Sequence, residues 1–202
     1  MPFKDIKQAV ISVGGKGTRL KEITGNIPKP LFPIAEISCL ERCFINLQFF
    51  GISKVFLLTS YNIELFELKK EYFSRKYDIS LELFQEEVPL GECGGLWNIE
   101  QYLDEDFLFL GGDLIWDIDI YRAIDFHKRM DSTVTLFTHI SSHPYDSDLI
   151  IESQSKEVKR FLCKPHKESS IISAYLGNAG ISIINKKLLE EKAPPQKTIS
   201  LF

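Results

Sequence analysis

The stretch AVISVGGKGTRLKEITGNIPKPLFP, residues 9–33, joins an apolar run to a glycine-rich turn, an arginine, and a lysine between two prolines. The apolar run over residues 9–13 predicts a buried strand that leads into the turn. Gly14, Gly15 and Gly17 lack a Cβ atom, so the backbone there can bring its N–H groups close to phosphate oxygens. This stretch therefore predicts a buried strand followed by an anion-binding loop.

Two cations follow the glycines. Arg19 offers a planar fork for bidentate phosphate contact, and Lys29 offers a compact point charge. Pro28 and Pro30 restrain the backbone on both sides of Lys29, so its presentation costs little entropy. The stretch is neither a Walker loop nor a dinucleotide fingerprint, because it lacks GK[ST] and has Leu20 at the place of the third glycine. The alternatives are a plain tight turn and a solvated surface arginine and lysine.

Strand and helix patterns alternate along the first two-thirds of the chain. Strands are expected at 8–13, 54–59, 80–84 and 107–110. Helices are expected from a capping box at Ser38 to Gly51, over 63–76, and from Asp119 to Met130. In the second helix, the apolar stripe is expected at Leu65, Leu68, Tyr72 and Phe73. This alternation predicts a mostly parallel central sheet with helices on both faces.

In open α/β sheets, ligands bind beyond the carboxyl ends of the strands. The glycine loop follows the first predicted strand, and the segment QEEVPLG at 85–91 follows the third. Residues 111–113, GGD, follow the fourth. Three motifs are thus expected on one rim of the sheet.

These motifs make the chain resemble the sugar-1-phosphate nucleotidylyltransferases, a family with a GT-A-like, Rossmann-like fold. The resemblance rests on six segments in order: GGKGTRL at 14–20, PKPL at 28–31, EEVPLG at 86–91, LGGD at 110–113, KP at 164–165 and NAG at 178–180. Within the family it is most similar to guanylyltransferases acting on mannose- or heptose-1-phosphate. HPYDSDL at 143–149 and KPH at 164–166 further resemble proteins that carry such a domain ahead of a HAD-type phosphatase.

The resemblance implies a nucleotidyltransferase that joins a nucleoside triphosphate to a sugar-1-phosphate with Mg²⁺ and releases pyrophosphate. A phosphate monoester has its second pKa near 6, so the attacking oxygen is ionised at neutral pH without a general base. Catalysis should then rest on positioning and on neutralising charge. The competing interpretation is a regulatory domain that binds a nucleotide or nucleotide sugar without turnover.

The resemblance also implies a role for each matching residue. Arg19 and Lys29 are the expected catalytic cations, and Asp113 is the expected Mg²⁺ ligand, with a helix N-cap or turn aspartate as its alternative. Lys164 is expected to grip the sugar phosphate. The remaining nucleotide-binding residues are Val13, Gly14, Gly15, Gly17, Thr18, Glu86 and Gly91, and the remaining sugar-phosphate residues are Gly112 and Asn178.

Other residues also have open alternatives. Glu86 suits guanine, whose N1–H and N2 amine are adjacent donors that one carboxylate can accept together. Its alternatives are a solvated loop glutamate and a one-residue slip that would substitute the amide of Gln85. Asn178 is a sugar-hydroxyl ligand or a turn residue. His143, Asp146 and Asp148 line a lid on the sugar side or belong to a surface loop.

The chain departs from the family pattern in two places. Cys163 stands where the family often has a glutamate that contacts sugar hydroxyls. In addition, no aspartate follows Asp148, whereas family members usually carry a second magnesium aspartate near their carboxyl end. The sequence could be a fragment of a longer protein, another ligand could substitute, or one metal site could be lost. The expectation is a fragment, a single nucleotidyltransferase domain over 1–202 that is truncated at its C-terminal end.

Composition limits the remaining function classes. The net charge of −4 and the interspersed charges of the 202 residues argue against a nucleic-acid partner. No apolar run reaches the length of a membrane span and no signal-peptide pattern is present, so a cytoplasmic protein without membrane partners is expected. Cys39 and Cys43 lie four apart on a predicted helix, which favours core packing over metal binding.

Overall fold

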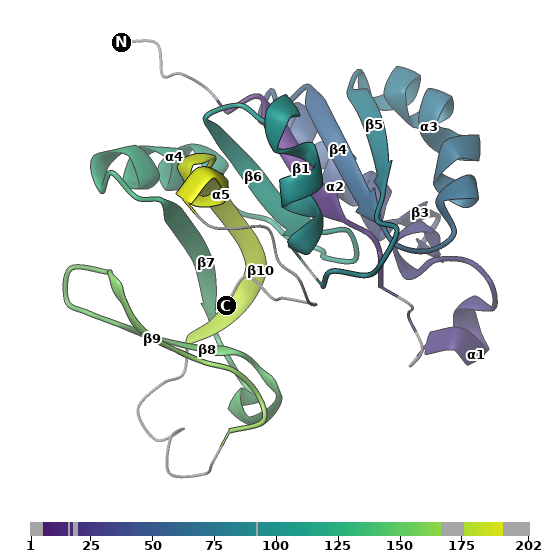
Figure 1. Ribbon diagram of the computed structural model, residues 1–202. Coiled ribbons are helices and arrows are strands. Elements are labelled where there is room, and N and C mark those ends of the chain that lie inside the picture. Colours follow the sequence, from purple (N-terminus) through teal and green to yellow (C-terminus); the bar gives the residue numbers. More distant parts are fainter. Residues whose placement is uncertain (1–5, 16, 18–19, 92, 167–175, 192–202) are drawn as a thin grey trace. The chain divides into compact units, whose positions relative to one another are not determined.

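The computed structural model describes residues 6–15, 17, 20–91, 93–166 and 176–191 (Figure 1). The chain divides into two compact units, the first with residues 1–135 and 182–201 and the second with 136–181 and 202. That all of them form one functional domain stays a prediction. Among the described residues, no helix combines the length and the apolar character that crossing a bilayer requires.

The first unit is built on parallel strands. These are β1 (Gln8–Ser12), β4 (Lys54–Thr59), β5 (Ser80–Gln85) and β6 (Asp106–Gly111). They lie in the order β5-β4-β1-β6, and every pair within this row is parallel. The predicted strands agree with these bounds to within one residue at each end. The mostly parallel sheet predicted from the sequence is therefore confirmed.

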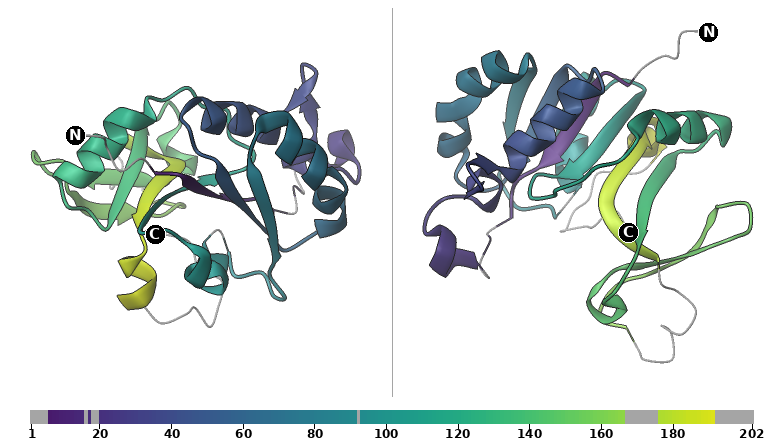
Figure 2. Two further views of the ribbon diagram at one scale, coloured as in Figure 1. Left: turned by 90° about the horizontal axis from the view of Figure 1, so that it is seen from above. Right: turned by 180° about the vertical axis from the view of Figure 1, so that it is seen from behind.

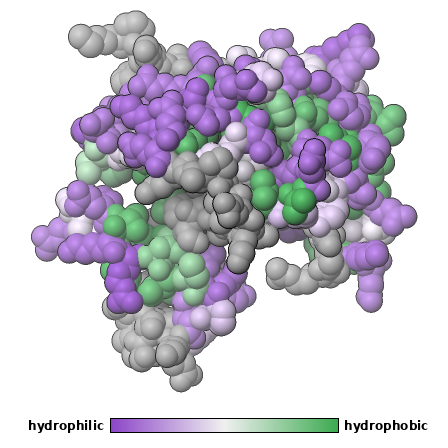
Figure 3. Space-filling view, in the orientation of Figure 1, coloured by the Kyte–Doolittle hydropathy of each residue, from purple (hydrophilic) through white to green (hydrophobic). Residues whose placement is uncertain are grey.

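Helices cover both faces of this sheet, as predicted. Figure 2 shows α2 (Cys39–Phe49) and α3 (Ile63–Tyr77) on one face and the 3-10 helix η3 (Gly94–Tyr102) on the other. Alternate strand residues point to opposite faces. On the η3 side, Val10, Phe56 and Phe109 pack with Leu96 and Ile99. The surface over α4 (Ile120–Arg129) and α5 (Lys187–Glu191) is mostly hydrophilic (Figure 3).

The predicted N-terminal caps of α2 and α4 are confirmed. The Ser38 side chain accepts a hydrogen bond from the backbone N–H of Glu41, and the Glu41 carboxylate accepts one from the backbone N–H of Ser38. This is the predicted capping box at the start of α2. Asp119 caps α4 by accepting from the backbone N–H of Arg122. Between the glycine loop and α2 lie the short elements α1 (Lys21–Thr24), η2 (Lys29–Leu31), β2 (Pro33–Ile34) and β3 (Ile37–Ser38).

The predicted apolar stripe of α3 is wrong in part. Leu68 and Tyr72 are 81% and 54% exposed, whereas Phe66, Phe73 and Tyr77 are buried. The rings of Phe73 and Tyr77 lie 5.4 and 5.5 Å from the ring of Phe44 on α2. The stripe of Phe66, Phe73 and Tyr77 buries more apolar area than the stripe through Leu68 would. This is why the aromatic side of the helix faces the core.

A buried polar network, which the sequence analysis did not find, joins α4 to the sheet of the first unit. His127 lies with Nδ1 2.7 Å from Thr135 Oγ1 and Nε2 3.3 Å from Asp106 Oδ1. Asn185 Nδ2 donates to the same Asp106 oxygen at 2.8 Å. The hydrogen bond with His127 is the main cause that lowers the pKa of the Asp106 carboxyl. The network satisfies polar groups that would otherwise be costly to bury.

The second unit is mainly antiparallel. Strand β8 (Leu149–Glu152) pairs with β9 (Val158–Leu162) and with β10 (Leu176–Asn185), and β7 (Val134–Ile140) also pairs with β10. The first two residues of β7 and the last four of β10 belong to the first unit. The short helix η4 (Pro144–Asp146) precedes β8. Leu149 is buried with partly buried Ile151 and Leu162 around it, which makes a much smaller core than that of the first unit.

Candidate active site

The glycine loop begins where β1 ends. Val13 donates its backbone N–H to the carbonyl of Leu58 at 2.8 Å, which extends the contact of this strand with β4. A Cβ atom on Gly14 would come within 2.8 Å of Ser60 Oγ, so only glycine fits there. Gly17 has φ +58°, a left-handed conformation that favours glycine. The predictions for Thr18 and Arg19 concern positions outside the described residues.

Lys29 and Asp113, 84 positions apart, meet in an ion pair in the first unit. Lys29 Nζ lies 2.5 Å from Asp113 Oδ2. The lysine begins η2, and the aspartate follows the end of β6. Both side chains are about 40% exposed, so they are partly open to ligands from solvent. The contact unites a predicted catalytic cation with the predicted metal ligand.

The N-cap alternative for Asp113 is wrong, because α4 begins at Ile120 and is capped by Asp119. Asp113 does lie in a turn, so the alternative of a turn aspartate stays open beside the metal-ligand prediction. Gly112, beside it, is tightly packed: a Cβ atom there would lie 2.6 Å from Val13 Cγ1 and 3.4 Å from Pro30 Cβ. Its backbone N–H donates to the carbonyl of Ser12. Gly112 thus has a structural reason to be glycine, and its predicted contact with the sugar phosphate stays a prediction.

No group of three or more His, Cys, Asp or Glu side chains within the described ranges is arranged to hold a metal ion. A single carboxylate still fits Mg²⁺, which commonly binds one or two carboxylates together with substrate phosphates and water. Cys39 and Cys43 lie in the core, as predicted. Burial raises the pKa of the Cys43 thiol to about 12, and burial followed by the charge of Asp113 raises that of Cys39. Burial thus favours the neutral thiol at both positions, which is consistent with a packing role.

Glu86 is buried rather than solvated, with only 6% exposure. Its carboxylate Oε2 accepts from the hydroxyl of Ser60 at 2.6 Å and from the backbone N–H of Leu90 at 3.4 Å. The solvated-loop alternative is therefore wrong. Gln85 is exposed at the end of β5. Gly91 has φ +90°, which a side chain would strain.

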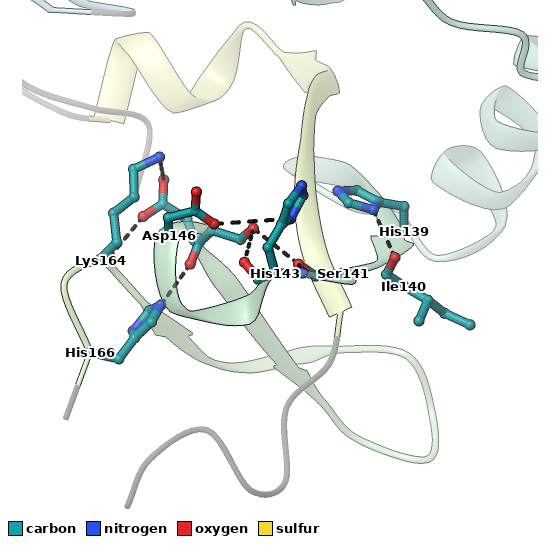
Figure 4. A network of polar contacts seen from close by, with 9 residues as sticks. His139, Ile140, Ser141, His143, Asp146, Lys164 and His166 are labelled. Atoms are coloured by element: carbon teal, nitrogen blue, oxygen red, sulfur yellow. Dashed lines mark hydrogen bonds and ion pairs between the residues drawn. The ribbon is translucent and has the colours of Figure 1, made fainter. Parts of the chain in front are cut away.

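In the second unit, Lys164 is held by Asp148. Figure 4 shows Lys164 and His166 within the surrounding network of polar contacts. The backbone N–H of Lys164 donates to Asp148 Oδ1 at 3.0 Å, and its Nζ lies 4.0 Å from Asp148 Oδ2. His166 Nε2 lies 2.6 Å from the carbonyl oxygen of Ser147. Ser147 and Asp148, which precede β8, are thus bonded to His166 and Lys164, which follow β9.

Asn178 belongs to the same region. Its backbone N–H donates to the carbonyl of Asp148 at 2.9 Å, and its Oδ1 accepts from the backbone N–H of Gly180 at 3.2 Å. The second bond is typical of a turn residue. His143 Nδ1 and Asp146 Oδ1 are 4.0 Å apart, and both side chains are largely exposed. A lid role for these two residues and for Asp148 stays a prediction.

Ser60 is the residue at this site that the sequence analysis missed. It directly follows β4, as the glycine loop follows β1 and Glu86 follows β5. The rule that ligands gather at the carboxyl ends of parallel strands applies to it equally. Applying that rule to every predicted strand, including 54–59, would have found it.

Comparison with known proteins decides the family. The family model for nucleotidyl transferases matches residues 8–199. This chain belongs to the nucleotidyl transferase family. The motifs at 14–20, 28–31 and 110–113 are therefore those of a nucleotidyl transferase, as the resemblance implied.

Two relatives of this nucleotidyl transferase show its nearer similarities. A D-glycero-alpha-D-manno-heptose 1-phosphate guanylyltransferase of Campylobacter jejuni is 39% identical over 192 residues, 94% of this chain and 81% of the relative. A mannose-1-phosphate guanylyltransferase of Mycobacterium tuberculosis is 36% identical over 129 residues, 63% of this chain and 36% of the relative. The chain spans about half or less of the length of several curated relatives that it matches.

The fold of this nucleotidyl transferase also occurs among solved structures. The crystal structure of HddC from Yersinia pseudotuberculosis matches with a TM-score of 0.75 at 24% identity, over 96% of this chain and 83% of that chain. At this identity the likeness concerns the fold alone. It confirms the α/β architecture that the sequence predicted.

Proposed function

We propose that this chain carries the catalytic machinery of a sugar-1-phosphate nucleotidylyltransferase. It would join a nucleoside triphosphate, GTP by preference, to a hexose- or heptose-1-phosphate and release pyrophosphate. The observation that carries the proposal is the pair of Lys29, at the start of η2, and Asp113, which follows β6. The pair borders the glycine loop, since a Cβ atom on Gly17 would lie 3.7 Å from Lys29 Cβ. A cation and an acidic metal ligand at one point are what an in-line transfer between phosphates requires.

The reaction forms one bond and breaks one. An oxygen of the sugar phosphate attacks the α-phosphorus, and the bond from that phosphorus to the bridging oxygen of the β-phosphate breaks. The leaving pyrophosphate takes up the electron pair. No proton has to be removed from the nucleophile, because a phosphate monoester is already largely ionised at neutral pH.

Each predicted site residue has a separate role in this reaction. The backbone of the glycine loop, with Val13, Gly14, Gly15, Gly17 and Thr18, would cradle the triphosphate, and Arg19 would neutralise charge on the leaving group. Lys29 would contact the transferred phosphoryl group. Asp113 would hold Mg²⁺, which supplies charge neutralisation between phosphates when it is bound.

Base and sugar choice have separate support. Glu86 is a buried acceptor that suits the two adjacent donors of guanine, and Gly91 would let the backbone approach the base. The names of two relatives, a mannose-1-phosphate and a heptose-1-phosphate guanylyltransferase, support GTP and a hexose- or heptose-1-phosphate as the substrates. Lys164 would bind the sugar phosphate, and Gly112 and Asn178 have the same proposed role. A cytoplasmic location and a fused phosphatase remain predictions of the same proposal.

The test is a pyrophosphate-release assay. The chain is incubated with Mg²⁺, each of four nucleoside triphosphates and several hexose- and heptose-1-phosphates. We expect release with GTP and one sugar phosphate class, and loss of release in Arg19→Ala. Nucleotide-induced thermal stabilisation without release from any pair would favour the regulatory alternative.

A further inference from the structure

The contact between Ser60 and Glu86 joins the segments that follow β4 and β5. The Ser60 hydroxyl donates to Glu86 Oε2 at 2.6 Å, the shorter of the two hydrogen bonds described for this carboxylate. The backbone N–H of Glu86 donates to the carbonyl of Thr59 at 2.9 Å. The backbone of Glu86 is therefore bonded to Thr59 and its carboxylate to the next residue, Ser60. These two bonds restrain the side-chain rotamer of Glu86.

Two glycines border this pair. A Cβ atom on Gly14 would come 2.8 Å from Ser60 Oγ and 2.9 Å from Ser60 N. A Cβ atom on Gly95, at the start of η3, would come 2.6 Å from Glu86 Oε1. Approaches this close require a neighbour to move, and here the neighbours are hydrogen-bonded to each other. Any side chain at position 14 or 95 would disturb the same carboxylate.

The chemistry of the pair bears on the choice of base. A carboxylate accepts hydrogen bonds only, and Ser60 and Leu90 both donate to Oε2. Guanine offers two adjacent donors on one edge, whereas the corresponding edge of adenine offers an acceptor beside a donor. A fixed acceptor separates these bases, because the wrong base leaves a buried polar group unpaired. A carboxylate free to rotate would separate them less well.

We propose that Ser60 is a positioning residue that holds Glu86 in the orientation that selects the base of the nucleotide. This inference rests on the proposed function, since it assigns the base-recognition part of the same site. Ser60 touches the selecting carboxylate and acts through it. Gly95 serves the same end by leaving space at the other carboxylate oxygen.

The test compares affinities for GTP and ATP by titration calorimetry in the wild-type chain, Ser60→Ala, Glu86→Gln and the double variant. Ser80→Ala removes an exposed hydroxyl from β5 of the same unit and is the matched control. We expect Ser60→Ala to lower the ratio of GTP to ATP affinity by about tenfold, the size expected for losing a hydrogen bond to a charged group. We expect the ratio to be unchanged in Ser80→Ala.

The double variant distinguishes positioning from general loosening. If Ser60 acts through Glu86, then Ser60→Ala should change the ratio no further once Glu86→Gln is present. The ratio of two affinities measured on one preparation does not depend on its folded fraction, so partial unfolding cannot imitate the result.

Two failures are distinguishable. A wild-type chain that prefers GTP, together with a Ser60→Ala variant that keeps the full preference, would overturn this inference and leave the proposed function intact. Additive effects in the double variant would do the same. A wild-type chain that binds no nucleoside triphosphate would overturn the proposed function itself, before any variant is measured.

Discussion

The two units hold their candidate substrate residues by different means. In the first, Val13, Ser60, Glu86 and Asp113 all follow parallel strands. The side chains of β1, β4 and β6 are largely buried, and β5 lies beside them with alternate side chains exposed. In the second, Lys164 follows a short antiparallel strand and is held by Asp148 through one backbone hydrogen bond and a longer ion pair. The first arrangement depends on the packing of a large core, and the second depends on polar contacts near the surface.

The two regions should therefore tolerate different kinds of substitution. Each fully buried aliphatic or aromatic side chain contributes about 1.5–3 kcal/mol, and a packed core resists any added atom. An exposed ion pair contributes about 0–1 kcal/mol and weakens with salt. Substitutions around the first site should therefore act through steric fit and charge, whereas those around Lys164 should act mildly.

The largest effect is expected for Lys29→Ala. Removing a preorganised cation that neutralises developing charge should lower kcat/KM for pyrophosphate release by roughly 10²–10³-fold. Unfolding should change little, because the Lys29–Asp113 pair is about 40% exposed. Lys21→Ala, an exposed lysine in α1, is the control and should keep full activity. Equal activity in both variants would remove Lys29 from the catalytic machinery.

Gly112→Ala should show how tightly the first unit is packed. The added Cβ atom would lie 2.6 Å from Val13 Cγ1 and 3.2 Å from Ile11 Cγ2, both stiff β-branched side chains. We expect a loss of about 1–3 kcal/mol in the free energy of unfolding, measured by urea denaturation. Gly15→Ala is the matched control, because its Cβ atom would meet nothing within 4 Å. Equal stability of the two variants would contradict the packing argument.

Glu41 tests whether polar contacts within the first unit also stabilise it. Burial by itself raises the pKa of Glu41, but hydrogen bonds from the Ser38 backbone, Tyr77 and Lys76 outweigh it and bring the pKa from 4.5 to about 2. Because the folded-state value is the lower one, the stabilisation is complete above about pH 4.5 and is lost as the pH falls towards about 2.

Glu41→Gln should therefore lower the free energy of unfolding by on the order of 1–2 kcal/mol at pH 6, and by less at pH 3. Urea denaturation at several pH values gives the difference from the wild type. Glu67→Gln, an exposed residue of α3, is the control. A difference that stays constant between pH 6 and pH 3 would show that the carboxylate charge contributes nothing.

The smallest effect is expected in the second unit. Asp148→Ala removes the acceptor of the Lys164 backbone N–H and the ion-pair partner of its Nζ. We expect KM for the sugar-1-phosphate to rise several-fold while KM for the nucleotide stays nearly constant, since one exposed contact of this kind is worth about 1 kcal/mol. Lys159→Ala is the control, because Lys159 is an exposed residue of β9 in the same unit and has no predicted role in binding. A change in nucleotide KM alone would contradict the assignment.

The sequence predicted much of the first unit because its signals are local. The capping box at Ser38 and the Asp119 cap depend on residues three apart, and both were found where predicted. The prediction for α3 was wrong at Leu68 and Tyr72. The predicted and the buried stripes share Phe73, and only its packing against Phe44 of α2 shows which stripe is buried. The burial of Glu86 was missed for the same reason, since it depends on a neighbouring strand.

Strand bounds, helix caps and the glycine and proline positions of the phosphate-loop motif could be read from the sequence by itself, since hydrophobic period and backbone freedom act over a few residues. The contacts of Lys29 with Asp113, 84 positions away, and of Ser60 with Glu86, 26 positions away, arise only when the chain folds. Parallel strand order brings the ends of distant strands to one edge of the sheet, and no local pattern encodes which side chains then touch.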